Sequence, residues 1–507
     1  MDTLQYLMNG FATALQWHNL LFAFIGVMIG TMVGVLPGIG PLSGVALLIP
    51  VTSSLTSGLS PEEAATSSII LLAGVYYGAM YGGSTTSILL NTPGEASSVA
   101  TVMDGYPMAK QGRAGSALAI SAIGSFFAGI VSLVGLVLLA KPLANVALKI
   151  GPADECSLMI LGLCAVSGLA GKSITKALMM TVFGLLLATI GIDAVSGVSR
   201  FTFDIPELYQ GFEFLTVAVG VFALGEVFKT IIEGNENQGE IAKIKRIMPT
   251  RQDLKDSVGP IIRGSLLGFF KGIVPGSGAS VASFLSYMLE KKISKHPEKF
   301  GHGAIEGVAG PESANNAASG GAMIPLLTLG IPGTGTTAIL MGALIMYNVQ
   351  PGPLLFDEHP QVAWGLIASM FIGNLMLLLL NMPLVKVFAK IIETPTKYLI
   401  PGIIALSFFG VYVVQVSVFN LGLLLFFGLI GYFLSKNDYP MAPLVLGLVL
   451  GPMIENNLRR ALTASNGDYS IFVSRPASLI FLIIAFAWMA VPVILKMKGK
   501  KVIVEEA

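Results

Sequence analysis

Two short segments of this chain combine a Pro-Gly pair with clustered hydroxyl and amide side chains. The first lies within residues 82–98, with its Pro-Gly pair at 93–94, and the second lies within residues 320–337, with its pair at 332–333. Proline suits the first turn of a new helix, and glycine lets the backbone approach a ligand closely. Free N–H groups at such a helix start bind anions, and nearby Ser or Thr hydroxyls add donors. The two tips are therefore predicted to hold a negatively charged group such as a carboxylate.

Polar and small residues around the two tips are predicted to contact that anion. The predicted contacts are Ser84, Thr85, Asn91, Thr92, Pro93, Gly94, Asn315, Thr328, Pro332, Gly333 and Thr334. Glu95, Glu312 and Asn316 are predicted to couple a cation, because ionisable groups beside apolar segments are rare and usually functional. A structural alternative stays open, since Asn and Ser favour N-caps and an acid stabilises the first turn of a helix.

The composition indicates which elements carry these residues. Only 12% of the 507 residues are charged, against about 25% in an ordinary soluble protein, and 54% are hydrophobic. A soluble chain of this length needs far more charge to cover its surface. We therefore predict an all-α polytopic integral membrane protein in a lipid bilayer.

Bulk charge and residue spacing exclude several other functions. A net charge of +1 provides no basic surface for nucleic acid. The four histidines are scattered, and Cys156 and Cys164 lie in an apolar stretch, so no metal site is predicted beyond Na⁺. No Gly-x-Ser-x-Gly motif and no complete phosphate-binding loop occurs, so the protein is not predicted to be an enzyme.

About 10–14 membrane segments are predicted, because a bilayer core of about 30 Å needs about 20 apolar residues per helix. The long segments are 20–36, 64–80, 115–140, 156–170, 174–192, 215–232, 362–392, 399–414, 418–434, 441–454 and 477–496. Shorter pieces, broken by Gly and Pro, are 41–52, 84–91, 258–273, 279–289, 317–331 and 334–347. These pieces are predicted to form half-helices or re-entrant hairpins that line a cavity, where irregular backbone is tolerated.

The two tips belong to an internal repeat. Four glycines and a proline of residues 30–40 recur in residues 268–278 at a constant offset of 238. The motif residues interpreted as structural are Pro37, Gly38, Gly40, Pro275, Gly276 and Gly278. The same offset carries the glycine pair 82–83 onto 320–321, and one added residue then aligns 93–94 with 332–333. The two halves of the chain are therefore predicted to be related.

Loop charges predict that the second copy is inverted in the membrane. Residues 53–63 contain two acids and no basic residue, whereas the equivalent residues 291–301 contain four lysines. The bias then reverses, with Lys110 and Arg113 after the first tip and only acids at 357–358 after the second. Because cytoplasmic loops collect Lys and Arg, an inverted-topology repeat with discontinuous helices is predicted.

This topology divides the chain along its length. Residues 1–19 are predicted to be a periplasmic N-terminal segment, 20–232 the first transmembrane repeat and 233–257 a cytoplasmic linker. Residues 258–455 are predicted to form the second transmembrane repeat, and 456–507 a C-terminal helix with a basic tail. Inverted repeats with broken helices are typical of secondary transporters, which bind substrate at the midplane where the repeats meet.

Motifs across the chain resemble those of one transporter family. They include VLPGIG at 35–40, NTPGEA at 91–96 and LTLGIPG at 327–333, with others at 77–84, 104–109 and 306–317. Together they resemble the large membrane subunit of the tripartite tricarboxylate transporter family over roughly residues 20–455. The resemblance implies a multi-pass symporter of the bacterial inner membrane, coupled to Na⁺ or H⁺. It also implies a small membrane subunit and a periplasmic binding protein that delivers a di- or tricarboxylate, and no cofactor beyond a coupling Na⁺.

Two other functions stay open at this point. A passive organic-anion channel needs a continuous polar pore rather than two closed tips. An intramembrane enzyme that uses Glu95 and Glu312 as an acid/base pair needs both carboxylates within about the reach of one bridging water. Cation-coupled uptake with alternating access around the two tips is the favoured hypothesis.

Overall fold

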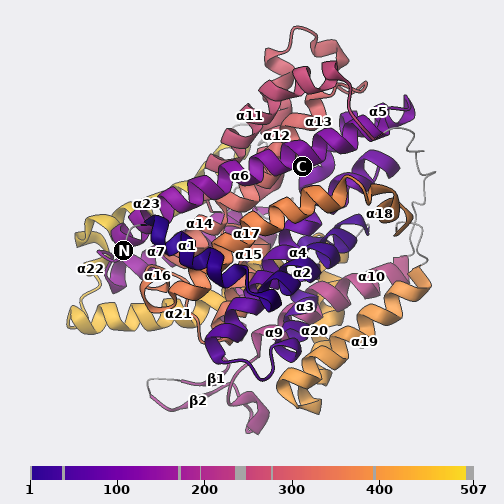
Figure 1. Ribbon diagram of the computed structural model, residues 1–507. Coiled ribbons are helices and arrows are strands. Elements are labelled where there is room, and N and C mark those ends of the chain that lie inside the picture. The colour runs from indigo at the N-terminus through magenta and orange to yellow at the C-terminus, as the bar shows by residue number, and fades with distance from the viewer. Residues whose placement is uncertain are drawn as a thin grey trace.

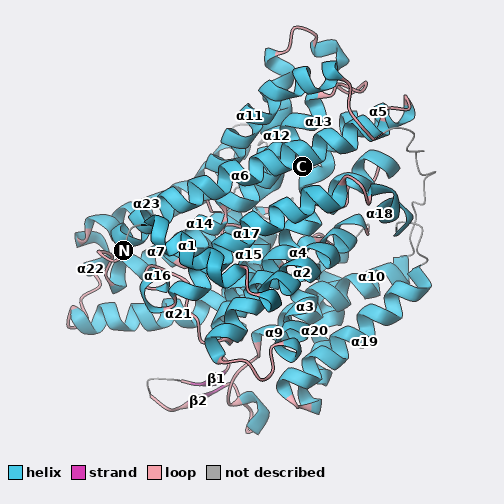
Figure 2. Cartoon of the chain, viewed as in Figure 1, coloured by secondary structure: helices cyan, strands magenta, loops and turns pink. Residues whose placement is uncertain are grey.

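The computed structural model shows a helical protein in which helices from the two halves of the chain pack between one another (Figure 1). It describes residues 3–36, 40–169, 173–193, 196–233, 247–275, 278–391 and 396–497. Within these residues nearly all regular structure is helical, and the strands form one two-stranded hairpin (Figure 2). Seven of the described helices are long and apolar enough to cross a membrane, and four shorter apolar helices accompany them. The prediction of an all-α polytopic membrane protein is confirmed.

Each half begins with a helical unit that carries one tip. The first unit contains α1 (Thr3–Ala14), α2 (Trp17–Val35), α3 (Pro41–Leu55), α4 (Pro61–Leu90), η1 (Ala96–Ser98), α5 (Val99–Lys110) and α6 (Ala114–Ala147). The second contains α11 (Arg251–Ile273), α12 (Gly278–Ile293), η4 (Pro297–Lys299), α13 (Glu306–Gly321), α14 (Met323–Leu329), α15 (Gly335–Met346), α16 (Leu355–Glu358) and α17 (Pro360–Asn381).

The remaining elements flank these two units. After α6 come α7 (Pro152–Leu169), α8 (Ile174–Ala188), β1 (Gly191–Ile192), β2 (Ser199–Arg200), η2 (Pro206–Leu208), α9 (Phe214–Ala218), the π-helical turn η3 (Val219–Leu224) and α10 (Gly225–Glu233). After α17 come α18 (Val385–Ile391), α19 (Thr396–Gln415), α20 (Val418–Lys436), α21 (Ala442–Ala464), α22 (Ile471–Ser474) and α23 (Pro476–Met497).

Several predicted segments differ from the observed helices. The pieces 64–80 and 84–91 form one continuous helix, α4, because its small residues pack against α2 without interrupting the helix. The piece 258–273 is part of α11, a full-length helix that begins inside the predicted linker because Thr250 caps its N-terminus. The predicted span 362–392 is divided between α17 and α18.

Matched stripes of glycine pack α2 against α4 in the first unit and α11 against α13 in the second. The stripes consist of Gly26, Gly30 and Gly34 on α2 and of Gly264, Gly268 and Gly272 on α11. A Cβ at Gly30 would lie 2.4 Å from the carbonyl oxygen of Val75, and a Cβ at Gly268 would lie 2.1 Å from that of Ala314. No side chain fits in either place, so these helices pack backbone to backbone, as small-residue stripes allow in membranes.

The same contacts fix the alignment of the two tips. Gly82 packs against the carbonyl oxygen of Thr31, and Gly321, rather than Gly320, packs against that of Phe269. The two glycines are 239 residues apart, whereas their partners are 238 residues apart. The added residue of the second half therefore lies before the glycine pair, and not after it as the sequence alignment predicts.

Contacts between the halves show how the long helices run. The Lys141 Nζ of α6 lies 4.3 Å from the ring centre of Tyr6, and this ring stacks on Trp364 near the start of α17. Farther along α17, the Asn374 side-chain amide donates to the Phe126 carbonyl of α6 at 2.9 Å. The equivalent helices α6 and α17 therefore run in opposite directions.

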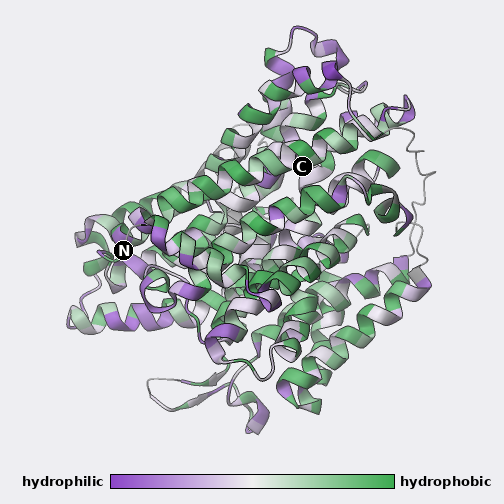
Figure 3. Ribbon diagram, viewed as in Figure 1, coloured by the Kyte–Doolittle hydropathy of each residue, from purple (hydrophilic) through white to green (hydrophobic). Residues whose placement is uncertain are grey.

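Polar loops gather at the ends of the molecule. At one end Gln111 donates to the His302 carbonyl at 2.7 Å, and Arg113 pairs with Asp253 at 2.7 Å. Burial opposes the charged form of Asp253, but hydrogen bonds from Thr250 and Arg113 outweigh it and keep the pKa of this carboxyl below its usual value. Hydrophilic residues lie at both ends and hydrophobic residues cover the helices between them, which is the distribution that a bilayer requires (Figure 3).

Candidate functional site

The first tip is a tight turn that brings the chain back against the helix it leaves. α4 ends at Leu90, and the next residue, Asn91, has a left-handed backbone (φ 60°) that directs the chain out of the helix. Gly94 then lies so close to α4 that a Cβ would be 2.5 Å from the Cα of Gly83. Glu95 is the N-cap of η1, and its backbone N–H donates to the Ser98 hydroxyl at 3.3 Å.

The second tip repeats this geometry at equivalent positions. α14 ends at Leu329, and the next residue, Gly330, is also left-handed (φ 67°). A Cβ at Gly333 would lie 3.0 Å from the Cβ of Ala322. Thr334 is the N-cap of α15, and its hydroxyl accepts from the Thr337 N–H at 3.2 Å. The turn residue, the Pro-Gly pair and the cap therefore coincide in the two halves at an offset of 239.

A buried carboxylate joins the two halves beside the first tip. Glu312 lies in the middle of α13 and is fully buried. Ser84 of α4 donates to its Oε2, and Thr101 of α5 donates to its Oε1. The side-chain amide of Asn315 lies 3.4 Å from Oε2, and Ser121 of α6 also interacts with the carboxylate. The second half thus supplies the acid, and the first half supplies hydroxyl donors.

The neighbouring amides extend this buried cluster. The Asn316 side-chain nitrogen donates to the Ser125 hydroxyl at 2.8 Å, to the Glu312 carbonyl at 3.1 Å and to the Asn315 side-chain oxygen at 2.5 Å. The Asn316 Oδ1 is buried and has no hydrogen-bond partner among the described residues. All three α13 residues lie inside the helix, so the alternative that they cap the following half-helix is wrong.

Glu95 lies close to this cluster but in a different setting. It is half-buried, and Ser97 donates to its carboxylate. Its Cγ packs on Gly83, where a Cβ would be 2.8 Å away, and its charge interacts with that of Glu312. The structure therefore places both predicted acids in one region. As the cap of η1, Glu95 has a structural role, and its role in cation coupling stays a prediction.

Two tyrosines that the sequence analysis does not predict belong to the same region. The Tyr76 hydroxyl interacts with the side chains of Ser319 and Thr334 and with the charge of Glu95. The neighbouring Tyr77 is buried, and its hydroxyl has no hydrogen-bond partner within the described part of the chain. Tyr76 therefore connects the second tip, through Thr334, with the first tip, through Glu95.

Other predicted substrate contacts make local interactions instead. Asn91 is exposed, and the Thr92 hydroxyl lies 3.4 Å from the Leu90 carbonyl oxygen. The Thr328 hydroxyl donates to the Ile324 carbonyl of its own helix at 2.7 Å. The residues that pack inside the molecule are Ser84, Thr85, Gly94, Asn315, Thr328, Pro332 and Gly333, with Pro93 and Thr334 half-buried. Substrate contact by any of them stays a prediction.

The glycine and proline motifs before α3 and α12 are described only in part. Pro37, Gly38 and Gly276 lie outside the described residues. Gly40 is the N-cap of α3, and Gly278 begins α12 with a left-handed backbone (φ 59°). Pro275 follows the end of α11.

Fold and site together define a multi-pass membrane protein whose halves meet at two broken-helix tips around buried polar groups. The chain belongs to the tripartite tricarboxylate transporter TctA family, whose family model matches residues 20–446. The resemblance that the motifs indicate is therefore confirmed. This membership makes the chain the large membrane subunit of a transport system that has partner subunits.

Two relatives come from Agrobacterium vitis. One, an uncharacterized 52.8 kDa protein in the TAR-I ttuC' 3'region, is 46% identical over 508 residues, and the similarity covers 100% of both chains. The other, an uncharacterized protein in the TAR-II ttuC' 3'region, is 45% identical over 245 residues, which are 48% of this chain and 100% of that protein. No solved structure matches the chain.

Proposed function

We propose that this chain carries a di- or tricarboxylate across the bacterial inner membrane by alternating access, coupled to the inward movement of Na⁺ or H⁺. A periplasmic binding protein delivers the substrate, and a small membrane subunit completes the complex. The substrate carboxylate binds between the tips, where the first N–H groups of α15 and the Thr334 hydroxyl supply donors. The coupling cation binds at Glu312, Asn316 and Glu95.

The position of Glu312 is the observation that carries this proposal. Its hydroxyl donors, Ser84 and Thr101, belong to the other half of the chain, so a movement of one half against the other breaks these hydrogen bonds. A buried charge that loses its partners is strongly destabilised. A Na⁺ ion or a proton at Glu312 offsets this loss, and cation binding is thereby linked to the relative position of the halves.

We infer that the two halves form an inverted-topology repeat. The matched glycine stripes and the matched tips support the relationship, and the opposite directions of α6 and α17 support the inversion. Two related halves of opposite orientation can exchange conformations, so that one structure opens to either side of the membrane. This symmetry favours a transporter over a channel with a permanently open pore.

Uptake by proteoliposomes that contain the chain with its partner subunits tests the proposal. An inward Na⁺ gradient, or an inward proton gradient, is expected to concentrate radiolabelled citrate or malate inside the vesicles beyond the external concentration. Dissipating that gradient with an ionophore is the control, and it should reduce uptake to equilibration. Uptake that ignores both gradients would contradict the coupling, and flux that only equilibrates the substrate would favour a passive channel.

A further inference from the structure

A cavity next to the second tip lies outside the proposed transport site. Its larger part has a volume of about 410 Å³ and adjoins a smaller part of about 240 Å³. Glu155, Gln350, Met453 and Arg460 line both parts, and the combined space is termed the vestibule. A cavity of this size accommodates a small organic ligand.

The vestibule lies at the end of the molecule opposite the basic loops. Ala147, at the end of α6, lines it, whereas the start of α6 follows Arg113 at the basic end. Gln350 belongs to the segment after α15, and Tyr347 of that segment accepts a hydrogen bond from Ser68, near the start of α4, at 2.8 Å. The predicted topology places this end, with loop 53–63, outside the cytoplasm.

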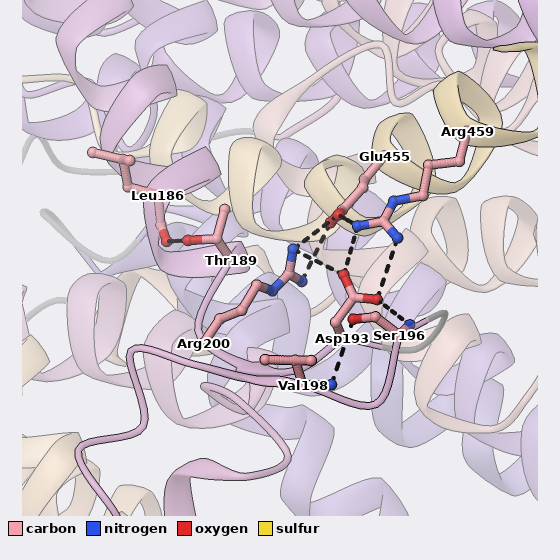
Figure 4. A network of polar contacts seen from close by, with 8 residues as sticks. All are labelled: Leu186, Thr189, Asp193, Ser196, Val198, Arg200, Glu455 and Arg459. Carbon is pink, nitrogen blue, oxygen red and sulfur yellow. Dashed lines mark hydrogen bonds and ion pairs between the residues drawn. The ribbon is translucent and has the colours of Figure 1, made fainter. Parts of the chain in front are cut away.

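Two adjacent arginines of α21 have opposite surroundings here. Arg459 lies in a network with Asp193, Arg200 and Glu455, and its Nη2 is 2.6 Å from a carboxylate oxygen of each acid (Figure 4). The hydrogen bond from Arg200, together with Arg459, keeps the pKa of Glu455 below its usual value, so these acids balance both cations. Arg460 is exposed, lines the vestibule and forms no ion pair with any described residue. Its guanidinium is therefore open to a ligand anion.

The other polar groups of the vestibule restrict what that ligand can be. Asn348 and Gln350 supply amides that donate or accept hydrogen bonds, and Glu358 adds a second carboxylate to the lining beside Glu155. Glu155 interacts with the buried Asn457 and with the charge of Arg460. One ligand carboxylate pairs with the Arg460 guanidinium through two parallel hydrogen bonds, and a neighbouring hydroxyl can donate to Glu155. A carboxylate in the place of that hydroxyl would be repelled, so any further carboxylate of the ligand must lie away from Glu155.

The inner wall of the vestibule is the back of the second tip. Leu329, Pro351 and Gly352 form this wall. Gly330, the turn residue of the tip, lies against Pro351, and a Cβ at Gly330 would be 2.7 Å from the Pro351 carbonyl oxygen. The second tip therefore borders the vestibule directly.

We propose that the vestibule is an outer binding site in which Arg460 and Glu155 hold a small hydroxy-carboxylate before the second tip admits it. This inference rests on the proposed function for its direction of transport. It adds a second site, and it adds a preference for substrates that carry a hydroxyl beside a carboxylate.

Protection of an introduced thiol tests this site. In the full-length chain with Cys156 and Cys164 changed to alanine, Asn456→Cys places a reactive group at the vestibule for a membrane-impermeant thiol reagent. Malate and citrate are expected to slow its labelling. Succinate and tricarballylate, which lack only the hydroxyl, are expected to protect at least about threefold less well, and Arg460→Gln is expected to raise the half-protecting concentration at least about tenfold.

Matched variants separate this site from the transport site. Arg251→Gln removes an exposed arginine at the opposite end and should leave protection unchanged, whereas Arg460→Lys should recover part of it, which excludes misfolding. Glu312→Gln should lower uptake by about 100-fold and leave protection intact, so the two proposals fail independently. Unchanged protection in Arg460→Gln would overturn the inference. So would a failure of both malate and citrate to protect the introduced thiol when Arg460 is intact. Equal protection by succinate would overturn the role of Glu155.

Discussion

The two tips share one backbone geometry, but the chemistry around them differs. In both, a left-handed residue follows the end of one helix, a Pro-Gly pair comes next, and an N-cap residue precedes the next helix. At the position equivalent to Glu312 the first half has Ala73, and at the position equivalent to Ser84 the second half has Met323. The backbone geometry of the tips and the glycine packing that supports it, together termed the frame, are therefore repeated. Each half contributes a different part of the polar cluster.

The unequal chemistry of the two halves allows a repeated fold to form a single site. Asn315 and Asn316 of the second half correspond to Tyr76 and Tyr77 of the first. The amides lie around Glu312, and Tyr76 lies between the tips. Two identical clusters would place two buried acids face to face, which is unfavourable without compensation. Changes to the frame are therefore expected to act equally in both halves, and changes to the chemistry unequally.

The largest expected effect is the unequal response of the two acids. Glu312→Gln is expected to lower gradient-driven uptake by about 100-fold, because losing charged hydrogen bonds costs about 2–3 kcal/mol. Glu95→Gln keeps the cap position and is expected to lower uptake by about tenfold or less. Initial rates in proteoliposomes measure both, and equal losses would contradict the division of roles.

Next in size is the packing of the glycine stripes. Gly30→Ala and Gly268→Ala each force a Cβ into a backbone carbonyl and are expected to cost about 2–3 kcal/mol, as overpacking does. Melting temperatures in detergent measure both. The Cβ of Gly422→Ala would meet nothing within 4 Å, so this variant serves as the control. If only one of Gly30→Ala and Gly268→Ala lowered the melting temperature, the packing of the two halves would not be equivalent.

A smaller effect distinguishes the two turn residues. Gly330→Ala places a side chain in a left-handed conformation against Pro351 and is expected to cost about 1–2 kcal/mol. Asn91→Gly is expected to be neutral within about 0.5 kcal/mol, because Asn91 is exposed and glycine accepts the same backbone. Thermal unfolding of both variants checks this, and a large loss in Asn91→Gly would give its side chain a role that the local contacts do not show.

The smallest expected effect concerns one hydroxyl in each capping box, that of the N-cap Thr334 at α15 and that of Ser98, which accepts from the N-cap Glu95 at η1. Thr334→Ala removes the acceptor for the Thr337 N–H, and Ser98→Ala removes the acceptor for the Glu95 N–H. Each is expected to cost about 1 kcal/mol, the usual value of a helix cap. The decrease in melting temperature should be similar for both, whereas Thr334→Ala should also weaken substrate binding because this hydroxyl faces Tyr76.

Much of the frame could be predicted from the sequence, because it depends on local rules. Low charge, glycine spacing and the paired Pro-Gly motifs indicate the membrane class, the related halves and the tips. The continuity of α4 could not be predicted, since Gly82 and Gly83 suggest a break unless α2 is known to pack on them. The sequence alignment places the added residue of the second half after the glycine pair, whereas the structure places it before. Neighbouring glycines align equally well in either register, so the sequence does not distinguish the two positions.

The polar cluster could be predicted only in part. Glu312, Asn315 and Asn316 are conspicuous in an apolar chain, but their partners are Ser84, Thr101 and Ser121, which are ordinary residues of transmembrane helices. Only the packing of α4, α5 and α6 against α13 selects them. Tyr76 and Tyr77 could have been found by asking which first-half residues occupy the positions of the two asparagines.

A double-mutant cycle between Ser84 and Glu312 tests whether both halves of the chain form one site jointly. Uptake is measured for Ser84→Ala, for Glu312→Gln and for the double variant. If the hydroxyl acts through the carboxylate, Ser84→Ala lowers uptake by about tenfold alone and causes no further loss beside Glu312→Gln. Two losses that multiply in the double variant would contradict the account, because they would show that the two side chains act independently.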